Sequence, residues 1–253
     1  MSGASFYLDR PLNIAHRGAR DSAPENTVAA FELALANGAD GIELDVTRCR
    51  SGEIVVLHDD TVDRTTNGSG SVADLSYEAL RELDAGSWFA ERYAGEHIPL
   101  LTDVLDAVGG KLRINIEIKG RSFRSDGIEE EIAGLVRSRG LTDSVIISSF
   151  NPWALGRMKR VAPELPIALL YWGKSPVYLR RAQPRLWLRP QALHPERGLV
   201  NARYVSWAHR QGLRVNVWTV NEPSQMRCLI AYGVDGIITD RPALLARVLA
   251  GGD

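Results

Sequence analysis

Short apolar runs alternate with amphipathic stretches from one end of the chain to the other. The runs have the length expected of strands and cover residues 12–15, 41–46, 54–57, 113–118, 145–149, 166–170, 191–193, 214–219 and 236–239. Strands that alternate with helices form parallel βα units, and a parallel strand covered on both faces reads as a continuous apolar run. The alternation therefore predicts an α/β fold built on a parallel sheet.

Helices are expected between these strands. The clearest cover residues 27–37, 128–138, 152–161, 201–211, 223–232 and 242–249. Pro223 opens one of them and Gly233 ends it, in line with the preference for proline at helix starts and glycine just after helix ends. Eight βα repeats result if the run at 54–57 extends the second strand. That count predicts a closed TIM (β/α)8 barrel.

The chain has 253 residues, and a barrel of about 250 residues is routinely one domain. We therefore predict a single domain over residues 1–253. Its regular pattern is interrupted at about 59–98, where a turn-rich loop at 65–70 precedes a short helix at 75–83. This stretch is interpreted as an insertion after the second strand that covers or flanks the carboxyl face.

Composition excludes several classes of protein. Hydrophobic residues make up 45% of the chain, charged residues make up 24%, and the formal net charge is −1, which is typical of a folded globular protein. Acids and arginines are interspersed, so nucleic acid is not expected as a partner. Cys49 and Cys228 are too few for a disulfide framework, which favours a reducing compartment. Residues 1–10 lack a signal-peptide pattern and no run reaches the length of a membrane span, so we predict a cytoplasmic protein without an integral membrane segment.

Charged side chains follow or interrupt the carboxyl ends of several strands. They are His16, Arg17, Glu43, Asp45, His58, Glu117 and Lys119. Charges at the ends of strands buried on both faces need a specific reason, and in parallel barrels that reason is usually an active site.

Spacing within two strands groups the carboxylates. Glu43 and Asp45 lie two residues apart, as do Glu117 and Lys119, so each pair shares one face of its strand. Three carboxylates around one point suit a single oxygen-seeking divalent cation, Mg²⁺ or Ca²⁺. Zinc fits less well because only two histidines are near and no cysteine joins them.

The remaining charges suit a phosphate ester. Arg17 can bind two phosphate oxygens in a fork and Lys119 adds a point charge. His16 and His58 can divide proton removal and proton donation between them. Taken one at a time, these residues also fit structural histidines and salt bridges, and Asp240 is expected to cap a helix or turn. Together they predict metal-assisted phosphoester chemistry.

The chain resembles the glycerophosphodiester phosphodiesterase family at these residues. The segments that carry the resemblance are His16-Arg17-Gly18, Pro24-Glu25-Asn26-Thr27, the run from Gly38 to Val46, Val56-Leu57-His58-Asp59, Ile116-Glu117-Ile118-Lys119, the run from Val217 to Asn221 and the run from Gly233 to Pro242. The resemblance covers almost the whole chain.

The resemblance implies a TIM barrel that hydrolyses glycerophosphodiesters, such as glycerophosphocholine, to glycerol 3-phosphate and an alcohol. It implies that Glu43, Asp45 and Glu117 bind the metal. It also implies roles for the other residues: His16 and His58 as acid and base, Arg17 and Lys119 as phosphate ligands, and Trp218 near the glycerol.

Three other functions stay open at this point. The same residues would serve a lysophospholipase D, a non-catalytic protein that binds glycerophosphodiesters, or a metal enzyme that uses Lys119 as a base. Residues 171–197 are either an irregular βα connection or a region that selects the alcohol or lipid portion. The choice of metal, the order of the two histidines, a cyclic phosphate intermediate and a homodimer are also left open.

Overall fold

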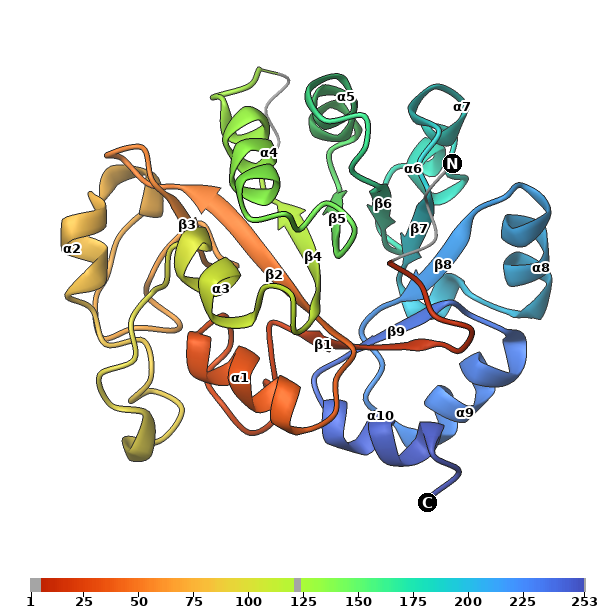
Figure 1. Cartoon of the computed structure of the whole chain (residues 1–253), viewed down its shortest axis with the longest axis horizontal. Coiled ribbons are helices and arrows are strands. Elements are labelled where there is room, and N and C mark those ends of the chain that lie inside the picture. The colour runs from red at the N-terminus through yellow and green to blue at the C-terminus, as the bar shows by residue number, and fades with distance from the viewer. Residues whose placement is uncertain (1–5, 121–123, 253) are drawn as a thin grey trace.

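Eight parallel strands close into a barrel in the computed structural model, which describes residues 6–120 and 124–252 (Figure 1). The barrel strands are β1 (Leu12–His16), β2 (Gly41–Arg48), β4 (Arg113–Ile118), β5 (Val145–Ser149), β6 (Ile167–Tyr171), β7 (Ala192–Pro195), β8 (Arg214–Val217) and β9 (Gly236–Thr239). Neighbours in this order pair in parallel, and β9 pairs with β1. The predicted TIM barrel is confirmed.

The remaining strand, β3 (Ile54–Val56), returns antiparallel along the carboxyl end of β2. Val46 pairs with Val56, and Arg48 pairs with Ile54. The run at 54–57 is therefore a separate antiparallel strand and not an extension of the second strand, although it stays outside the count of eight barrel strands as predicted. Its direction brings the chain back to the carboxyl face of the barrel just before His58.

Helices cover the outside of the barrel (Figure 1). They include α1 (Val28–Ala36), α3 (Leu101–Val108), α4 (Ile128–Ser138), α5 (Pro152–Val161), α8 (Ala202–Arg210), α9 (Pro223–Tyr232) and α10 (Pro242–Leu249). Thr27 caps α1 by accepting a hydrogen bond from the Ala30 amide, and Gly233 ends α9 with a left-handed φ of 81°. The six predicted helices match the structure to within one residue at either end.

The insertion after β3 has a small apolar core of its own. It carries η1 (Val72–Asp74), α2 (Tyr77–Arg81) and η2 (Glu91–Tyr93), so the helix expected at 75–83 is the shorter α2. Its core consists of Cys49, Val55, Leu57, Val62, Val72, Leu80, Ala85 and Ile98. The insertion flanks the carboxyl face, because the Tyr93 hydroxyl donates to the carbonyl of Ser22 in the loop after β1.

Apolar side chains fill the inside of the barrel. The cluster consists of Phe6, Leu12, Ile14, Ile146, Ala168, Ala192 and Ile238. The larger core lies between the strands and the surrounding helices. The buried carboxylates of the described barrel strands are Glu43, Asp45 and Glu117, toward the carboxyl ends of β2 and β4.

The segment at 171–197 forms two short helices before β7, α6 (Val177–Arg180) and α7 (Arg185–Leu188). No helix in the described part of the chain is both long and apolar enough to cross a membrane.

Candidate active site

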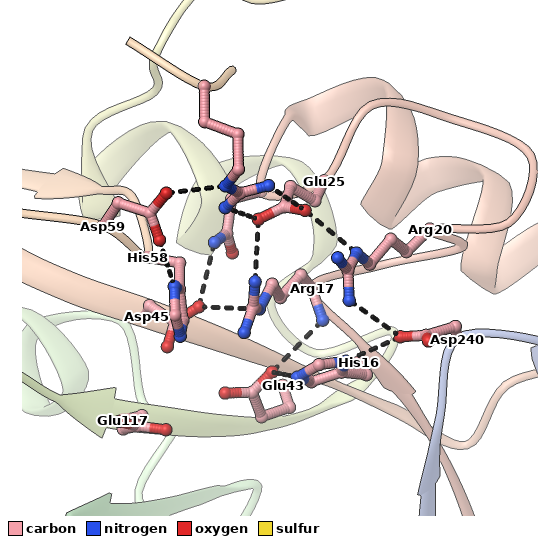
Figure 2. Close-up of polar contacts among 12 residues, drawn as sticks. His16, Arg17, Arg20, Glu25, Glu43, Asp45, His58, Asp59, Glu117 and Asp240 are labelled. Atoms are coloured by element: carbon pink, nitrogen blue, oxygen red, sulfur yellow. Dashed lines mark hydrogen bonds and ion pairs between the residues drawn. The ribbon is translucent and has the colours of Figure 1, made fainter. Parts of the chain in front are cut away.

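The seven charged residues predicted at strand ends come together at the carboxyl end of the barrel, and Figure 2 shows most of them in one cluster. His16 ends β1, Glu43 and Asp45 lie in β2, and Glu117 lies in β4. The other three follow the ends of strands: Arg17 after β1, His58 after β3 and Lys119 after β4. This is the end of the barrel at which TIM-barrel enzymes hold their active sites.

Glu43, Asp45 and Glu117 form a buried carboxylate triad, with one oxygen from each lying within 4.8 Å of the others. Asp45 and Glu117 are paired across β2 and β4, which places them side by side. Burial and the neighbouring carboxylates raise the pKa of Glu117 to about 7 and the pKa of Glu43 well above its usual range. Without a cation the triad therefore retains protons near neutral pH.

The triad fits a hard divalent cation. Its donors are carboxylate oxygens, which Mg²⁺ and Ca²⁺ prefer. The Asp45 Oδ1 atom is buried and accepts no hydrogen bond of normal geometry, although the Lys119 ammonium lies 3.3 Å away. An oxygen in that position is available as a metal ligand.

Two cations lie beside the triad. Lys119 Nζ is 2.9 Å from Glu117 Oε1, and Arg17 Nε is 3.3 Å from Asp45 Oδ2. Burial opposes the charged form of both side chains, but the nearby carboxylates outweigh it and raise both pKa values. Both groups are therefore charged at neutral pH.

His16 is oriented by a carboxylate from the other end of the sequence. Its Nδ1 atom lies 2.6 Å from Asp240 Oδ1, and its Nε2 atom lies 4.0 Å from Glu43 Oε2. The carboxylate favours a proton on Nδ1, which leaves the Nε2 lone pair directed to the triad. Burial lowers the pKa of His16.

His58 has the same arrangement with its sequence neighbour. The Nδ1 atom lies 2.5 Å from Asp59 Oδ1. Burial lowers the pKa of His58, and the Asp45 charge offsets part of this effect. Burial thus favours the neutral form of both histidines, in which Nε2 can accept a proton, while the carboxylate on each Nδ1 favours the protonated form.

One buried glutamate connects the two histidine–aspartate pairs (Figure 2). The Glu25 side chain is 2% exposed and accepts hydrogen bonds from Arg17 at 2.8 Å and from Arg64 at 2.7 and 2.9 Å. It also pairs with Arg20 at 2.9 Å.

Arg64 and Arg20 continue the connection outward from Glu25. Arg64 donates to Asp59 at 2.6 Å, and Arg20 Nη1 lies 3.5 Å from Asp240. A continuous line of charged contacts thus joins the two histidines. From one histidine to the other, the residues in contact are His58, Asp59, Arg64, Glu25, Arg20, Asp240 and His16.

Sequence reasoning misplaced Asp240 and missed the arginines of this line. The expectation that Asp240 caps a helix or turn is wrong, because Arg241 is the N-cap of α10 and the Asp240 carboxylate contacts His16 and Asn221. A signal was present, since Asp240 directly follows the last strand of a barrel in which that strand must pair with the first.

Trp218 directly follows the carboxyl end of β8 and is partly buried. Its indole N–H donates to the carbonyl of His194 at 2.8 Å, and its ring meets Phe150 edge-on at 5.5 Å. His194 itself is a buried core histidine whose pKa burial lowers to about 3, so it stays neutral at physiological pH.

Comparison with known proteins decides the family. Residues 16–244 match the model of the glycerophosphoryl diester phosphodiesterase family. The chain belongs to this family. It is an enzyme of the phosphodiesterase class, and the resemblance seen in its motifs is confirmed.

Relatives within the glycerophosphoryl diester phosphodiesterase family cover almost the whole chain. A glycerophosphodiester phosphodiesterase from Caldanaerobacter subterraneus subsp. tengcongensis is 42% identical over 96% of this chain and 99% of its own length. The crystal structure of an Agrobacterium tumefaciens glycerophosphodiester phosphodiesterase is 31% identical, with a TM-score of 0.80, and the match covers 92% of this chain and 97% of that one. An Oleispira antarctica phosphodiesterase, solved in complex with the product sn-glycerol-3-phosphate, is 29% identical with a TM-score of 0.84 over 99% of this chain and 100% of that one.

Proposed function

We propose that this enzyme hydrolyses glycerophosphodiesters to glycerol 3-phosphate and an alcohol, with one divalent cation held by Glu43, Asp45 and Glu117. The observation that carries the proposal is the pairing of two aspartate-oriented histidines with a buried carboxylate triad. The Oleispira antarctica relative, bound to sn-glycerol-3-phosphate, supports the choice of substrate.

A bound Mg²⁺ or Ca²⁺ supplies Lewis-acid chemistry, because it neutralises phosphate charge and orients the ester. The protein's own cations add to this. Arg17 is buried, Lys119 is half-buried, and both are charged and next to the triad, so each can bind a nonbridging phosphate oxygen. Their contacts with Asp45 and Glu117 fix the positions of both cationic groups beside the triad, where the phosphate would bind.

His16 and His58 carry the protons. One Nε2 atom accepts the proton of the attacking hydroxyl as the new O–P bond forms. The other histidine, protonated for this step, donates its Nε2 proton to the alcohol oxygen as the old P–O bond breaks. The aspartate on each Nδ1 stabilises the imidazolium form. The arrangement suits attack by water or by the neighbouring glycerol hydroxyl, and either histidine can act first.

Trp218 is proposed to border the glycerol. It stands at the carboxyl end of β8, and its ring is held in place by His194 and Phe150. Lys119 does not suit the role of a general base in an alternative reaction, because the surrounding carboxylates keep it protonated.

The direct test is release of glycerol 3-phosphate from glycerophosphocholine by purified protein, first after chelation and then after addition of Mg²⁺ or Ca²⁺. Release that returns with either metal supports the proposal. No release with either metal contradicts it.

Lysophospholipids are a second candidate substrate class. The observation that favours them is the group of exposed apolar side chains on α6 and α7, next to the carboxyl end of β6. Parallel assays with glycerophosphocholine and lysophosphatidylcholine separate the two classes. The cytoplasmic location, the single domain and the homodimer remain predictions.

A further inference from the structure

Large apolar side chains are exposed on one part of the barrel's outer surface. Among the described residues they concentrate on the first turn of α5 and on the segment through α6 and α7. They are Trp153, Trp172, Val177, Tyr178, Leu186 and Trp187. Leu186 is 70% exposed, far more than a structural role requires. Exposed apolar side chains concentrated in this way are typical of a site of interaction.

Two of these side chains are held together. The rings of Trp153 and Trp187 lie 5.4 Å apart at 35°. Gly156 makes this contact possible, because a Cβ atom at this position would lie 3.0 Å from the Trp187 ring. A hollow of about 430 Å³ opens between α5 and α7, and its lining includes both tryptophans, Arg157 and Arg160. The apolar surface is therefore built into the packing of the two helices.

The same stretch of chain is strongly basic, although the whole chain has a net charge of −1. Between Asp143 and Glu196 the only acidic residue is Glu164, and Glu164 is itself paired with Arg137. The basic residues in this stretch are Arg157, Lys159, Arg160, Lys174, Arg180, Arg181, Arg185 and Arg189. Acidic and basic residues are interspersed over most of the chain, but basic residues predominate in this stretch.

Some of these cations have partners inside the protein. Arg157 pairs with Glu129, Lys159 donates to the carbonyls of Leu188 and Arg189, and the Arg185 guanidinium lies over the Trp207 ring. Others are exposed, and one of them, Lys174, lies over the Trp172 ring. These exposed cations are Arg160, Lys174, Arg180, Arg181 and Arg189.

The apolar and basic surface begins at the rim of the candidate active site. Trp153 follows the end of β5 by four residues, and Trp172 directly follows β6. Both strands end at the carboxyl face of the barrel, and α5, α6 and α7 lie along one side of it (Figure 1). A partner bound to this surface would lie next to the mouth of the barrel.

We propose that this surface docks on a lipid bilayer that contains anionic lipids. Tryptophan, tyrosine and leucine side chains partition into the bilayer interface, while arginine and lysine bind anionic headgroups. The surface combines both kinds of residue, and the acidic residues of the described stretch are already engaged: Glu164 pairs with Arg137, and Glu196 accepts from the Gly173 amide. A second copy of this chain fits less well, because a two-fold contact would place the same cations against each other. Docking brings the mouth of the barrel to the membrane, where lipid-derived diesters are found.

The test uses the whole protein and vesicles of phosphatidylcholine with or without phosphatidylglycerol. In low salt we expect sedimentation with the anionic vesicles, a blue shift of tryptophan fluorescence, and binding at least tenfold weaker to phosphatidylcholine alone. High salt should weaken the anionic binding. Failure to bind the anionic vesicles in low salt overturns the proposal.

Substitutions locate the surface. Leu186→Asp and the double change Arg180→Glu with Arg181→Glu should each reduce vesicle binding at least tenfold. The matched controls are Leu35→Asp on α1 and Arg81→Glu on α2, which lie on other sides of the barrel (Figure 1). Equal loss in the controls contradicts the assignment. Self-association that only Leu186→Asp abolishes, without vesicle binding, assigns the surface to a second copy instead.

Turnover of water-soluble glycerophosphocholine separates this proposal from the proposed function. All four variants should retain it, because none of the substituted residues contacts the carboxylate triad or the histidines. Normal turnover with lost vesicle binding supports the docking surface. Absent turnover in the unmodified protein contradicts the proposed function. The vesicle assay still tests the docking proposal, because it measures binding and not turnover.

Discussion

Glu25 and Arg64 are joined by two hydrogen bonds of 2.7 and 2.9 Å, although they belong to separate segments of the chain. Glu25 lies in the loop after β1, and Arg64 lies in the insertion after β3. Because Arg64 also holds Asp59, this pair fixes the position of His58 relative to His16. The separation of two proton-transfer groups must match the substrate, so the pair has a direct bearing on catalysis.

Glu25→Gln should lower kcat by about 10- to 100-fold, the usual effect of removing a group that orients a functional side chain. The amide keeps the shape of the side chain but cannot neutralise three arginines. We expect KM to change less than kcat, and the pH profile to shift as the aspartates reorganise. Steady-state kinetics between pH 5 and 9 measure both effects. Unchanged kcat with an unchanged profile would show that Glu25 is only structural.

The same substitution should alter stability in acid. Burial favours the protonated form of Glu25, but Arg64, Arg17 and Arg20 outweigh it and hold the pKa below its usual range. A depressed pKa stabilises the fold above the unfolded value of about 4.3, and this stability is lost as pH falls below it. The Tm of the unmodified protein should therefore fall between pH 5 and 3 more steeply than that of Glu25→Gln. If the Tm values of the two proteins fall equally over that pH range, the depressed pKa of Glu25 is not the source of the acid sensitivity.

Metal affinity should increase with pH. Burial and Asp45 raise the pKa of Glu117 to about 7 in the absence of metal, so a proton competes with the cation below that pH. Displacement of one proton changes affinity by up to about tenfold per pH unit. Calorimetry at pH 6 and 8 should show tighter binding at pH 8 and proton release at pH 6. Glu117→Gln should weaken binding and reduce this dependence, and the part that is left reports the raised pKa of Glu43.

His58→Ala should reduce kcat by about 100-fold or more with the fold intact. Its matched control is His209→Ala, which removes an exposed histidine that also pairs with an aspartate, Asp235. Circular dichroism checks the fold of both variants. Near-normal turnover of His58→Ala would remove this residue from the proton-transfer steps.

Local patterns were sufficient to predict the barrel and the carboxylate triad. Apolar runs define strands, and two-residue spacing places Glu43 and Asp45 on one face of β2. The helix α3 was not predicted. It directly follows the irregular insertion, so the sequence pattern did not show where the regular βα repeats resume. The placement of the insertion beside the barrel mouth was anticipated from its position after the second strand.

Long-range contacts could not be predicted in the same way. His16 and Asp240 are 224 residues apart in sequence, and only closure of the barrel between β9 and β1 brings them together. The bonds of Glu25 likewise depend on how the insertion folds back on the loop after β1. Such contacts follow from tertiary packing, which no local pattern records.

Barrel closure therefore also sets the time at which the site becomes complete. The carboxylate triad lies on the neighbouring strands β2 and β4, so its geometry does not involve the last strand. His16 acquires Asp240 only after β9 has emerged from the ribosome and paired with β1. The two histidine–aspartate pairs are therefore both complete only in the closed barrel.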